Sequence, residues 1–256
     1  MQMKLSHWVI SGLLTSVLVI TGCTQSSAPT DTASVSPAAT ESAELASPSA
    51  VVGDDPFQNL PRLTGEATVQ LVVKGSPITI QVDGADAPIT AGNFVDLVNR
   101  GVYNGLAFHR VVREPQPFVV QGGDPQGRDP NFPIDRLGTG GFIDPATSQE
   151  RNIPLEIKPA EAEQPIYSKT FESEGLTEAP KLRHTRGAVA MARSTPPDSA
   201  SSQFYITLSD LEFLDGSYAV FGYVTSGMEV VDQIQQGDRI TSATVISGIE
   251  NLKPGG

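Results

Sequence analysis

Short apolar runs rich in β-branched residues recur along the chain beyond residue 56. Residues 68–73 (TVQLVV) and 78–82 (ITIQV) are short and rich in β-branched residues, and the turn-forming string KGSP separates them. This arrangement is typical of a β-hairpin. Further short runs of the same kind follow at 108–112, 118–120, 188–191, 203–208, 218–224 and 240–246. The pattern predicts a domain of many short antiparallel strands.

Two segments show helical spacing instead. The first opens at 87–90 (APIT), with Thr90 as the expected N-cap, and its apolar residues recur until Gly101. The second covers 228–236 (MEVVDQIQQ) and is expected to pack on the strands. Between 127 and 186 the chain is irregular, and only 153–157 (IPLEI) has the pattern of a strand. The elements together predict a mainly β fold, a closed barrel or a sandwich capped by two α-helices.

The N-terminus has the pattern of an export signal. Lys4 precedes an apolar stretch at 8–20 that is shorter than a membrane-spanning helix requires. The string ITGC at 20–23 then resembles the lipobox of bacterial lipoproteins, in which the cysteine is acylated and the chain is cut just before it. We therefore expect a signal peptide at 1–22 and a lipid anchor at Cys23. The alternative is an ordinary signal peptide with an incidental cysteine.

A low-complexity segment follows the expected anchor. Residues 24–55 consist mostly of Ser, Ala, Thr and Pro and contain no Lys or Arg. Such a composition does not bury enough apolar surface to fold, so we expect a tether that spans roughly 30 Å on average. The predicted organisation is a signal peptide at 1–22, an acylated Cys23 with linker at 23–55, and one folded domain at 56–256. The domain would face the periplasm or the exterior of the cell envelope, anchored to a bacterial membrane.

Charge and cysteine content narrow the function. The chain has 29 Asp and Glu against 17 Lys and Arg, a net charge of −12 and a pI near 4.6. This acidity argues against nucleic acid as a partner. With a single cysteine, no intrachain disulfide and no Cys-based metal site can form, and the three histidines are far apart in sequence. We expect neither a metal nor another cofactor.

The stretch FHRVVREPQPFVVQGGDP at 108–125 carries the candidate chemistry. If the two apolar runs in it pair as strands, alternation places Arg110 and Gln121 on the same side. The amide of Gln121 would then hold the guanidinium as a rigid donor fork. Gly122 and Gly123 leave open space in front of it. The sequence predicts a shallow pocket with one fixed cationic donor and no nucleophile.

Five strings in order resemble the cyclophilin family of peptidyl-prolyl cis-trans isomerases: FHR, FVVQGGDP, GAVAMAR, SSQFYITL and FLDGSYAVFGYV. The resemblance covers roughly residues 66–250. It implies an eight-stranded antiparallel closed β-barrel capped by two α-helices. It also implies an activity, the isomerisation of X–Pro bonds, and proline-containing segments of exported proteins as substrates.

The resemblance assigns roles residue by residue. Catalytic roles fall on Arg110, Phe118 and Gln121. Substrate-binding roles fall on Val119, Ala192, Arg193, Gln203, Tyr205, Phe213, Leu214 and Tyr218. In three of these positions the chain departs from the usual residue: Tyr205 stands where Phe is usual, Phe213 where many members have Trp, and Tyr218 where many have His. The missing indole predicts weak binding of cyclosporin A.

The residues fit the implied chemistry. Rotation about a peptide bond has a barrier of about 18–20 kcal/mol because the C–N bond is partly double. Twisting breaks that resonance, and a fixed guanidinium such as that of Arg110 stabilises the twisted amide selectively. An acceleration of about 10⁵-fold needs about 7 kcal/mol. The alternative function is a chaperone or scaffold module of the same fold that binds proline-containing peptides with little turnover.

Several features have simpler explanations. Arg110 could pair with Asp124 in a structural role, although the surrounding motifs favour catalysis. Alternation places His109 on the face opposite Arg110, so we expect a core histidine and not a base. The string GTGG at 138–141 suggests phosphate binding, but no clear helix follows, and a loop near the pocket is the better interpretation. The acidic region near 158–182 is expected to be a solvated insertion.

Overall fold

The computed structural model describes residues 55–255, which form one compact unit. The expected signal peptide, the anchor at Cys23 and nearly all of the linker lie outside the described residues. Within 55–255, every helix is too short or too polar to cross a membrane.

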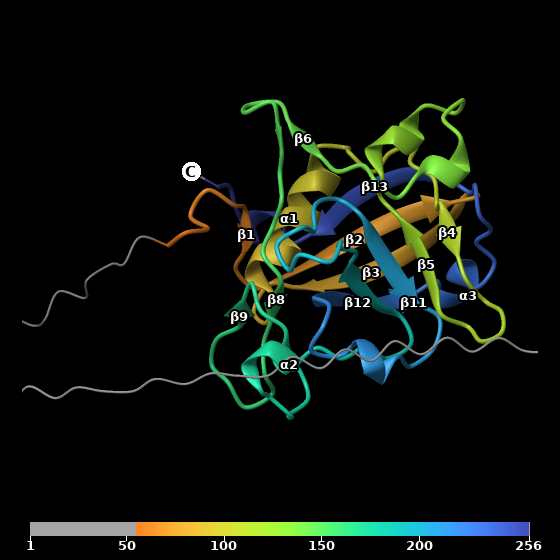
Figure 1. The fold of residues 1–256 in the computed structure, drawn as a ribbon. Helices are drawn as coiled ribbons and strands as arrows, with labels where there is room; N and C mark the ends of the chain where they lie inside the picture. Colours follow the sequence, from red (N-terminus) through yellow and green to blue (C-terminus); the bar gives the residue numbers. More distant parts are fainter. Residues whose placement is uncertain (1–54, 256) are drawn as a thin grey trace, which may run out of the picture. The chain divides into compact units, whose positions relative to one another are not determined.

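An eight-stranded antiparallel sheet forms the body of this unit (Figure 1). Its strand order is β13-β2-β3-β12-β10-β11-β5-β4. The bounds of the strands in chain order are β2 Glu66–Val73, β3 Ser76–Asp83, β4 Arg110–Val111, β5 Val119–Gly122, β10 Ala188–Met191, β11 Phe204–Thr207, β12 Val220–Ser226 and β13 Ile240–Ser247. Each of the eight apolar runs in the sequence contributes one of these strands, with boundaries that differ by a few residues.

The β2–β3 hairpin shows how the pattern determines the strands. Alternate residues along both strands are buried, as expected for strands with one face on the core. The turn is tighter than the four-residue string KGSP suggests, because Ser76 already pairs with Val73. Lys74 and Gly75 form the turn with φ of 51° and 78°. Two consecutive positive φ values are what a two-residue turn needs to match the twist of the strands.

Hydrogen bonds also link the two ends of the sheet. The segment just before β4 meets the start of β13, where Ala107 bridges Arg239. The amide of Phe108 donates to the carbonyl of Asp238 over 2.8 Å, and the amide of Ile240 donates to the carbonyl of Leu106 over 2.9 Å. The sheet is therefore strongly curled around its apolar face.

Helix α1 (Pro88–Asn99) packs into this curl and is almost completely buried. Phe94 lies at its centre, with ring centroids 4.8 Å from Phe221 and 5.4 Å from Phe204. The expected N-cap at Thr90 is wrong: the cap position is Ala87, and Thr90 lies inside the first turn.

A distant carboxylate replaces the missing cap. Glu156 accepts hydrogen bonds from the backbone amides of Ile89 and Thr90 at 3.1 and 2.7 Å. These amides have no partners within the helix, so the carboxylate satisfies donors that a local cap would otherwise serve. Burial raises the pKa of Glu156, and the two amides partly oppose that rise.

The remaining helices differ from the expectation. The second expected helix, 228–236, is shortened to α3 (Met228–Val231), and a further short helix, α2 (Phe171–Glu174), lies in the insertion. The expected strand at 153–157 is reduced to β8 (Glu156–Ile157). The insertion also contains regular secondary structure: β9 (Ile166–Tyr167) pairs with β8, and α2 lies close by (Figure 1). Two small ladders complete the structure: β1 (Arg62–Leu63) with β14 (Leu252–Lys253), and β6 (Ile143–Asp144) with β7 (Gln149–Glu150).

Candidate active site

Arg110 and Gln121 face each other across the β4–β5 ladder. They are direct partners in the register, and Nη1 of Arg110 donates to Oε1 of Gln121 over 3.2 Å. The guanidinium carbon also lies 5.4 Å from the centre of the Phe118 ring. Gln121 in turn donates from Nε2 to Oε1 of Gln203 over 3.2 Å. The exposed arginine is thus held on one side by an amide and on another by an aromatic ring.

A cavity of about 190 Å³ opens beside this arginine. Its walls come from the strands β4, β5 and β11, from the segment just after β10, and from the segment at 212–218 between β11 and β12. The lining residues are Arg110, Phe118, Val119, Gln121, Ala192, Arg193, Tyr205, Leu214 and Tyr218. The cavity has a cationic donor at one edge and aromatic or aliphatic groups around it, which suits a small apolar ring attached to a polar backbone.

Two residues expected at the pocket lie elsewhere. Gln203 does not line this cavity. Its Oε1 accepts the hydrogen bond from Gln121, and its Nε2 donates to the carbonyl of Gly140 over 2.8 Å. Phe213 is 72% exposed and stacks on Phe118, with ring centroids 6.1 Å apart and planes at 13°. Phe213 therefore lies at the rim, and its ring does not line the cavity.

Three further side chains build part of the cavity wall. Tyr205 on β11 is buried, and Tyr218 meets it edge to face with ring centroids 6.1 Å apart. The guanidinium of Arg193 lies 4.8 Å from the centre of the Tyr218 ring. Arg193 also donates to the carbonyl of Ser217 at 2.8 and 3.1 Å, which fixes its position. The contact between cation and ring holds Tyr218 against the cavity.

A second, more polar cavity of about 100 Å³ adjoins the first. It shares Gln121, Ala192 and Arg193 with the first cavity, and Glu150 and the loop at 138–140 form its other side. The loop is held by Asp124, whose Oδ2 accepts the amides of residues 138, 139 and 140 at 2.7–3.2 Å. The amides of the GTGG string, which could have bound a phosphate, are therefore bound by the carboxylate of Asp124.

The role of Asp124 also removes the structural alternative for Arg110. Asp124 is fully buried and its recorded partners are backbone amides, whereas Arg110 is paired with Gln121. The turn beside Asp124 depends on Gly123, which has φ of 93° and lies so close to the next strand that a Cβ would meet the carbonyl of Ser202 at 2.5 Å. Gly123 thus allows the end of β5 to approach the segment that leads into β11.

His109 lies in the core, as alternation predicts. It is 6% exposed, and burial lowers the pKa of its imidazole despite the nearby Asp124. Among residues 55–255, no three His, Cys, Asp or Glu side chains are grouped so that they could hold a metal ion.

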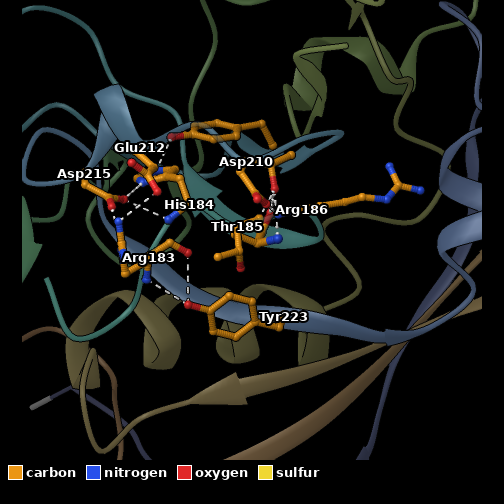
Figure 2. Close-up of polar contacts among 11 residues, drawn as sticks. Arg183, His184, Thr185, Arg186, Asp210, Glu212, Asp215 and Tyr223 are labelled. Carbon is orange, nitrogen blue, oxygen red and sulfur yellow. Dashed lines mark hydrogen bonds and ion pairs between the residues drawn. The ribbon is translucent and has the colours of Figure 1, made fainter. Parts of the chain in front are cut away.

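A buried polar chain behind the cavity was missed by sequence reasoning. His184 lies between Asp215 and Tyr205, with Nδ1 2.8 Å from Oδ1 of Asp215 and Nε2 3.0 Å from the Tyr205 hydroxyl. Asp215 makes polar contacts with both His184 and Arg183 (Figure 2). No periodicity marks His184, because it lies in the irregular stretch before β10. The available signal was the polar Tyr205 at a position where the family resemblance implies an apolar ring.

Comparison with known proteins places this fold and site in a family. Residues 68–251 match the family described as cyclophilin type peptidyl-prolyl cis-trans isomerase. The chain is 46% identical over 210 residues to a putative thylakoid lumen peptidyl-prolyl cis-trans isomerase of Synechocystis sp., covering 78% of this chain and 52% of that protein. It is 41% identical over 214 residues to a chloroplastic peptidyl-prolyl cis-trans isomerase of Arabidopsis thaliana, covering 77% and 46%. The chain thus spans about half the length of these two relatives.

The fold itself is shared with solved structures. A cyclophilin type peptidyl-prolyl cis-trans isomerase from Cryptosporidium parvum aligns with a TM-score of 0.52 at 23% identity, covering 71% of this chain and 98% of that one. The curled sheet, the enclosed helix and the site beside β4 and β5 thus define a mainly β protein of the cyclophilin fold. The chain belongs to the cyclophilin-type peptidyl-prolyl cis-trans isomerases.

Proposed function

We propose that the protein accelerates the cis-trans isomerisation of X–Pro bonds in polypeptides. The observation that carries this proposal is the Arg110 guanidinium, held by Gln121 at the edge of a cavity walled by Tyr205 and Leu214. In this interpretation the proline ring enters the cavity, and Arg110 lies against the amide that must twist. Family membership supports the same reaction class.

The site supplies stabilisation without a covalent step. A twisted amide leaves a lone pair on the proline nitrogen, and a positioned cation stabilises that state more than the planar one. The support of Arg110 by Gln121, and of Gln121 by Gln203, reduces the reorganisation needed when the amide twists. The apolar walls exclude water and strengthen the interaction. We also propose that the links between residues 105–108 and 237–240 close the sheet into a barrel, which makes this wall rigid.

The test is a protease-coupled isomerisation assay on the purified full-length protein with a proline-containing peptide. Arg110→Ala should lower kcat/KM at least about a hundredfold, because it removes the charged donor of the transition state. Arg136→Ala is the matched control, since it removes the same charge from an exposed site outside the cavities. Nearly unchanged turnover in Arg110→Ala, with an unchanged melting curve, would contradict the mechanism.

A binding module with little turnover is the second candidate. The guanidinium of Arg193 lies over the ring of Tyr218, at a position where the family resemblance implies His in many members. Compared with what the same resemblance implies, the loop between Val112 and Phe118 has three extra residues. Both features alter the pocket while leaving a cavity for a proline ring. Peptide binding by the wild-type protein without acceleration in the same assay would favour this candidate.

We further propose that the protein is exported and anchored to a membrane by acylation of Cys23. The proposal rests on the apolar segment at 8–20 and the string ITGC at 20–23. The relatives named as thylakoid lumen and chloroplastic proteins are in keeping with a compartment outside the cytoplasm. Exported polypeptides with proline-containing segments would then be the substrates.

A further inference from the structure

The hydroxyl of Tyr205 points away from the cavity that its ring helps to line. It meets Nε2 of His184 at 3.0 Å, and the His184 side chain is fully buried. On the other side of the imidazole, Nδ1 lies 2.8 Å from Oδ1 of Asp215. The three side chains form one continuous chain of hydrogen bonds behind the cavity wall.

The partners of Asp215 determine which nitrogen of His184 carries the hydrogen. Oδ1 also accepts the backbone amide of His184 over 2.8 Å, and Oδ2 accepts Nε of Arg183 over 3.2 Å (Figure 2). Both oxygens therefore act as acceptors, as in an ionised carboxylate. Nδ1 of His184 must then be the donor toward Asp215.

The remaining nitrogen can only accept. Burial lowers the pKa of His184 despite the hydrogen bond to Asp215, so the imidazole is neutral near neutral pH. In the neutral ring with hydrogen on Nδ1, Nε2 has a lone pair and no hydrogen. The Tyr205 hydroxyl must therefore donate to His184. Its hydrogen is committed to the side away from the cavity.

We propose that His184, oriented by Asp215, is a positioning residue for the proline-binding cavity, which keeps the Tyr205 ring in place and its hydroxyl hydrogen away from the substrate. This inference rests on the proposed isomerase function. It explains how a tyrosine serves at a position where an apolar ring is usual. The ring, held edge to face against Tyr218, offers carbon atoms to the substrate.

The tautomer can be measured directly in the purified full-length protein. The chain has three histidines, and His7 lies in the expected signal peptide, so nitrogen-15 imidazole spectra assigned with a His109 variant, and with a His7 variant where the uncleaved form is studied, isolate the signals of His184. Near neutral pH we expect a protonated Nδ1 and an unprotonated Nε2. A hydrogen on Nε2 would overturn the proposal, whether or not the protein is an active isomerase.

Kinetics test whether the hydrogen bond serves binding. His184→Asn keeps a donor toward Asp215 but loses the acceptor for Tyr205, so KM should rise about three- to tenfold with kcat nearly unchanged, as for loss of one neutral hydrogen bond. His184→Gln, which can place an acceptor near the position of Nε2, should recover part of this loss. In a Tyr205→Phe background, His184→Asn should have little further effect.

The outcomes separate the two proposals. An equal rise in KM with and without the Tyr205 hydroxyl would overturn the role of His184, because the effect would not pass through Tyr205. If His184→Asn does not fold, the imidazole spectra of the wild type still decide the hydrogen bond. If the wild-type protein shows no turnover, the proposed function fails, and the spectra test the hydrogen bond on their own.

Discussion

Arg110 and Gln121 are paired residues of the β4–β5 ladder, and their side chains are joined by a hydrogen bond of 3.2 Å. Because the two strands are hydrogen-bonded at this point, the separation of the side chains is set by the backbone. Gln121 is itself held by Gln203, which donates to the carbonyl of Gly140. The orientation of one exposed cation thus depends on a chain of amides that reaches into the neighbouring cavity.

Replacing Gln121 should weaken catalysis without removing the charge. Gln121→Leu leaves Arg110 in place but frees its guanidinium, so we expect kcat/KM to fall about tenfold, the effect of roughly 1.4 kcal/mol. Gln203→Leu acts one step further away and should have a smaller effect. The isomerisation assay measures both, and equal kcat/KM in wild type and Gln121→Leu would show that Arg110 needs no support.

Replacing Glu156 should destabilise the fold. Glu156→Ala leaves the amides of Ile89 and Thr90 buried without partners, at a cost of about 1–3 kcal/mol in the free energy of unfolding. Glu163→Ala, an exposed control in the insertion that follows β8, should change this free energy by less than about 0.5 kcal/mol. Urea unfolding followed by circular dichroism measures the difference, and similar values for the two variants would contradict the capping role.

The buried His109 should make stability depend on pH. Burial lowers its pKa in the folded protein below the ordinary value of 6.5, so between these two pKa values the unfolded chain binds more protons. Stability from this group is therefore lost as the pH falls through that window. His109→Leu removes the effect. The urea midpoint of the variant relative to that of the wild type should therefore rise as the pH falls from about 7.5 to about 5.5. A constant difference would contradict the assignment.

The rim residue Phe213 should affect drug binding more than turnover. Its ring stacks on Phe118 and is mostly exposed, so a larger indole fits there without entering the cavity. Phe213→Trp adds an N–H donor, and we expect inhibition by cyclosporin A to tighten about 2–15-fold, with a smaller change in kcat/KM. Inhibition constants of both proteins test this, and equal constants would show that Phe213 does not contact the drug.

The anchor has a separate test. Cys23→Ser removes the thiol that would be acylated, so the protein should change from a membrane-associated form to an uncleaved precursor or a soluble form. Fractionation of cells that express each form, with detergent extraction of the membranes, shows where the protein is found. The same distribution for both forms would rule out acylation at Cys23.

The sequence by itself predicted the strands and the central pair of the site. The β-branched runs at 68–73 and 78–82 predicted the hairpin, and alternate residues of its strands are buried because a strand has only two faces. The same rule placed Arg110 and Gln121 on one side and His109 on the other. The pattern was weakest between 127 and 186, where contacts with distant residues stabilise short elements that have no period of their own.

The tertiary structure decided the features that join distant parts of the chain. Glu156 caps a helix that begins 68 positions earlier at Pro88, and no local pattern can indicate such a partner. The sheet order brings β11 beside β5. The segment between β11 and β12 brings Asp215 to His184. Periodicity determines which face a residue occupies, whereas the distance between two faces depends on how the whole sheet curls. The direction of the Tyr205 hydroxyl and the place of Phe213 outside the cavity follow from that curl.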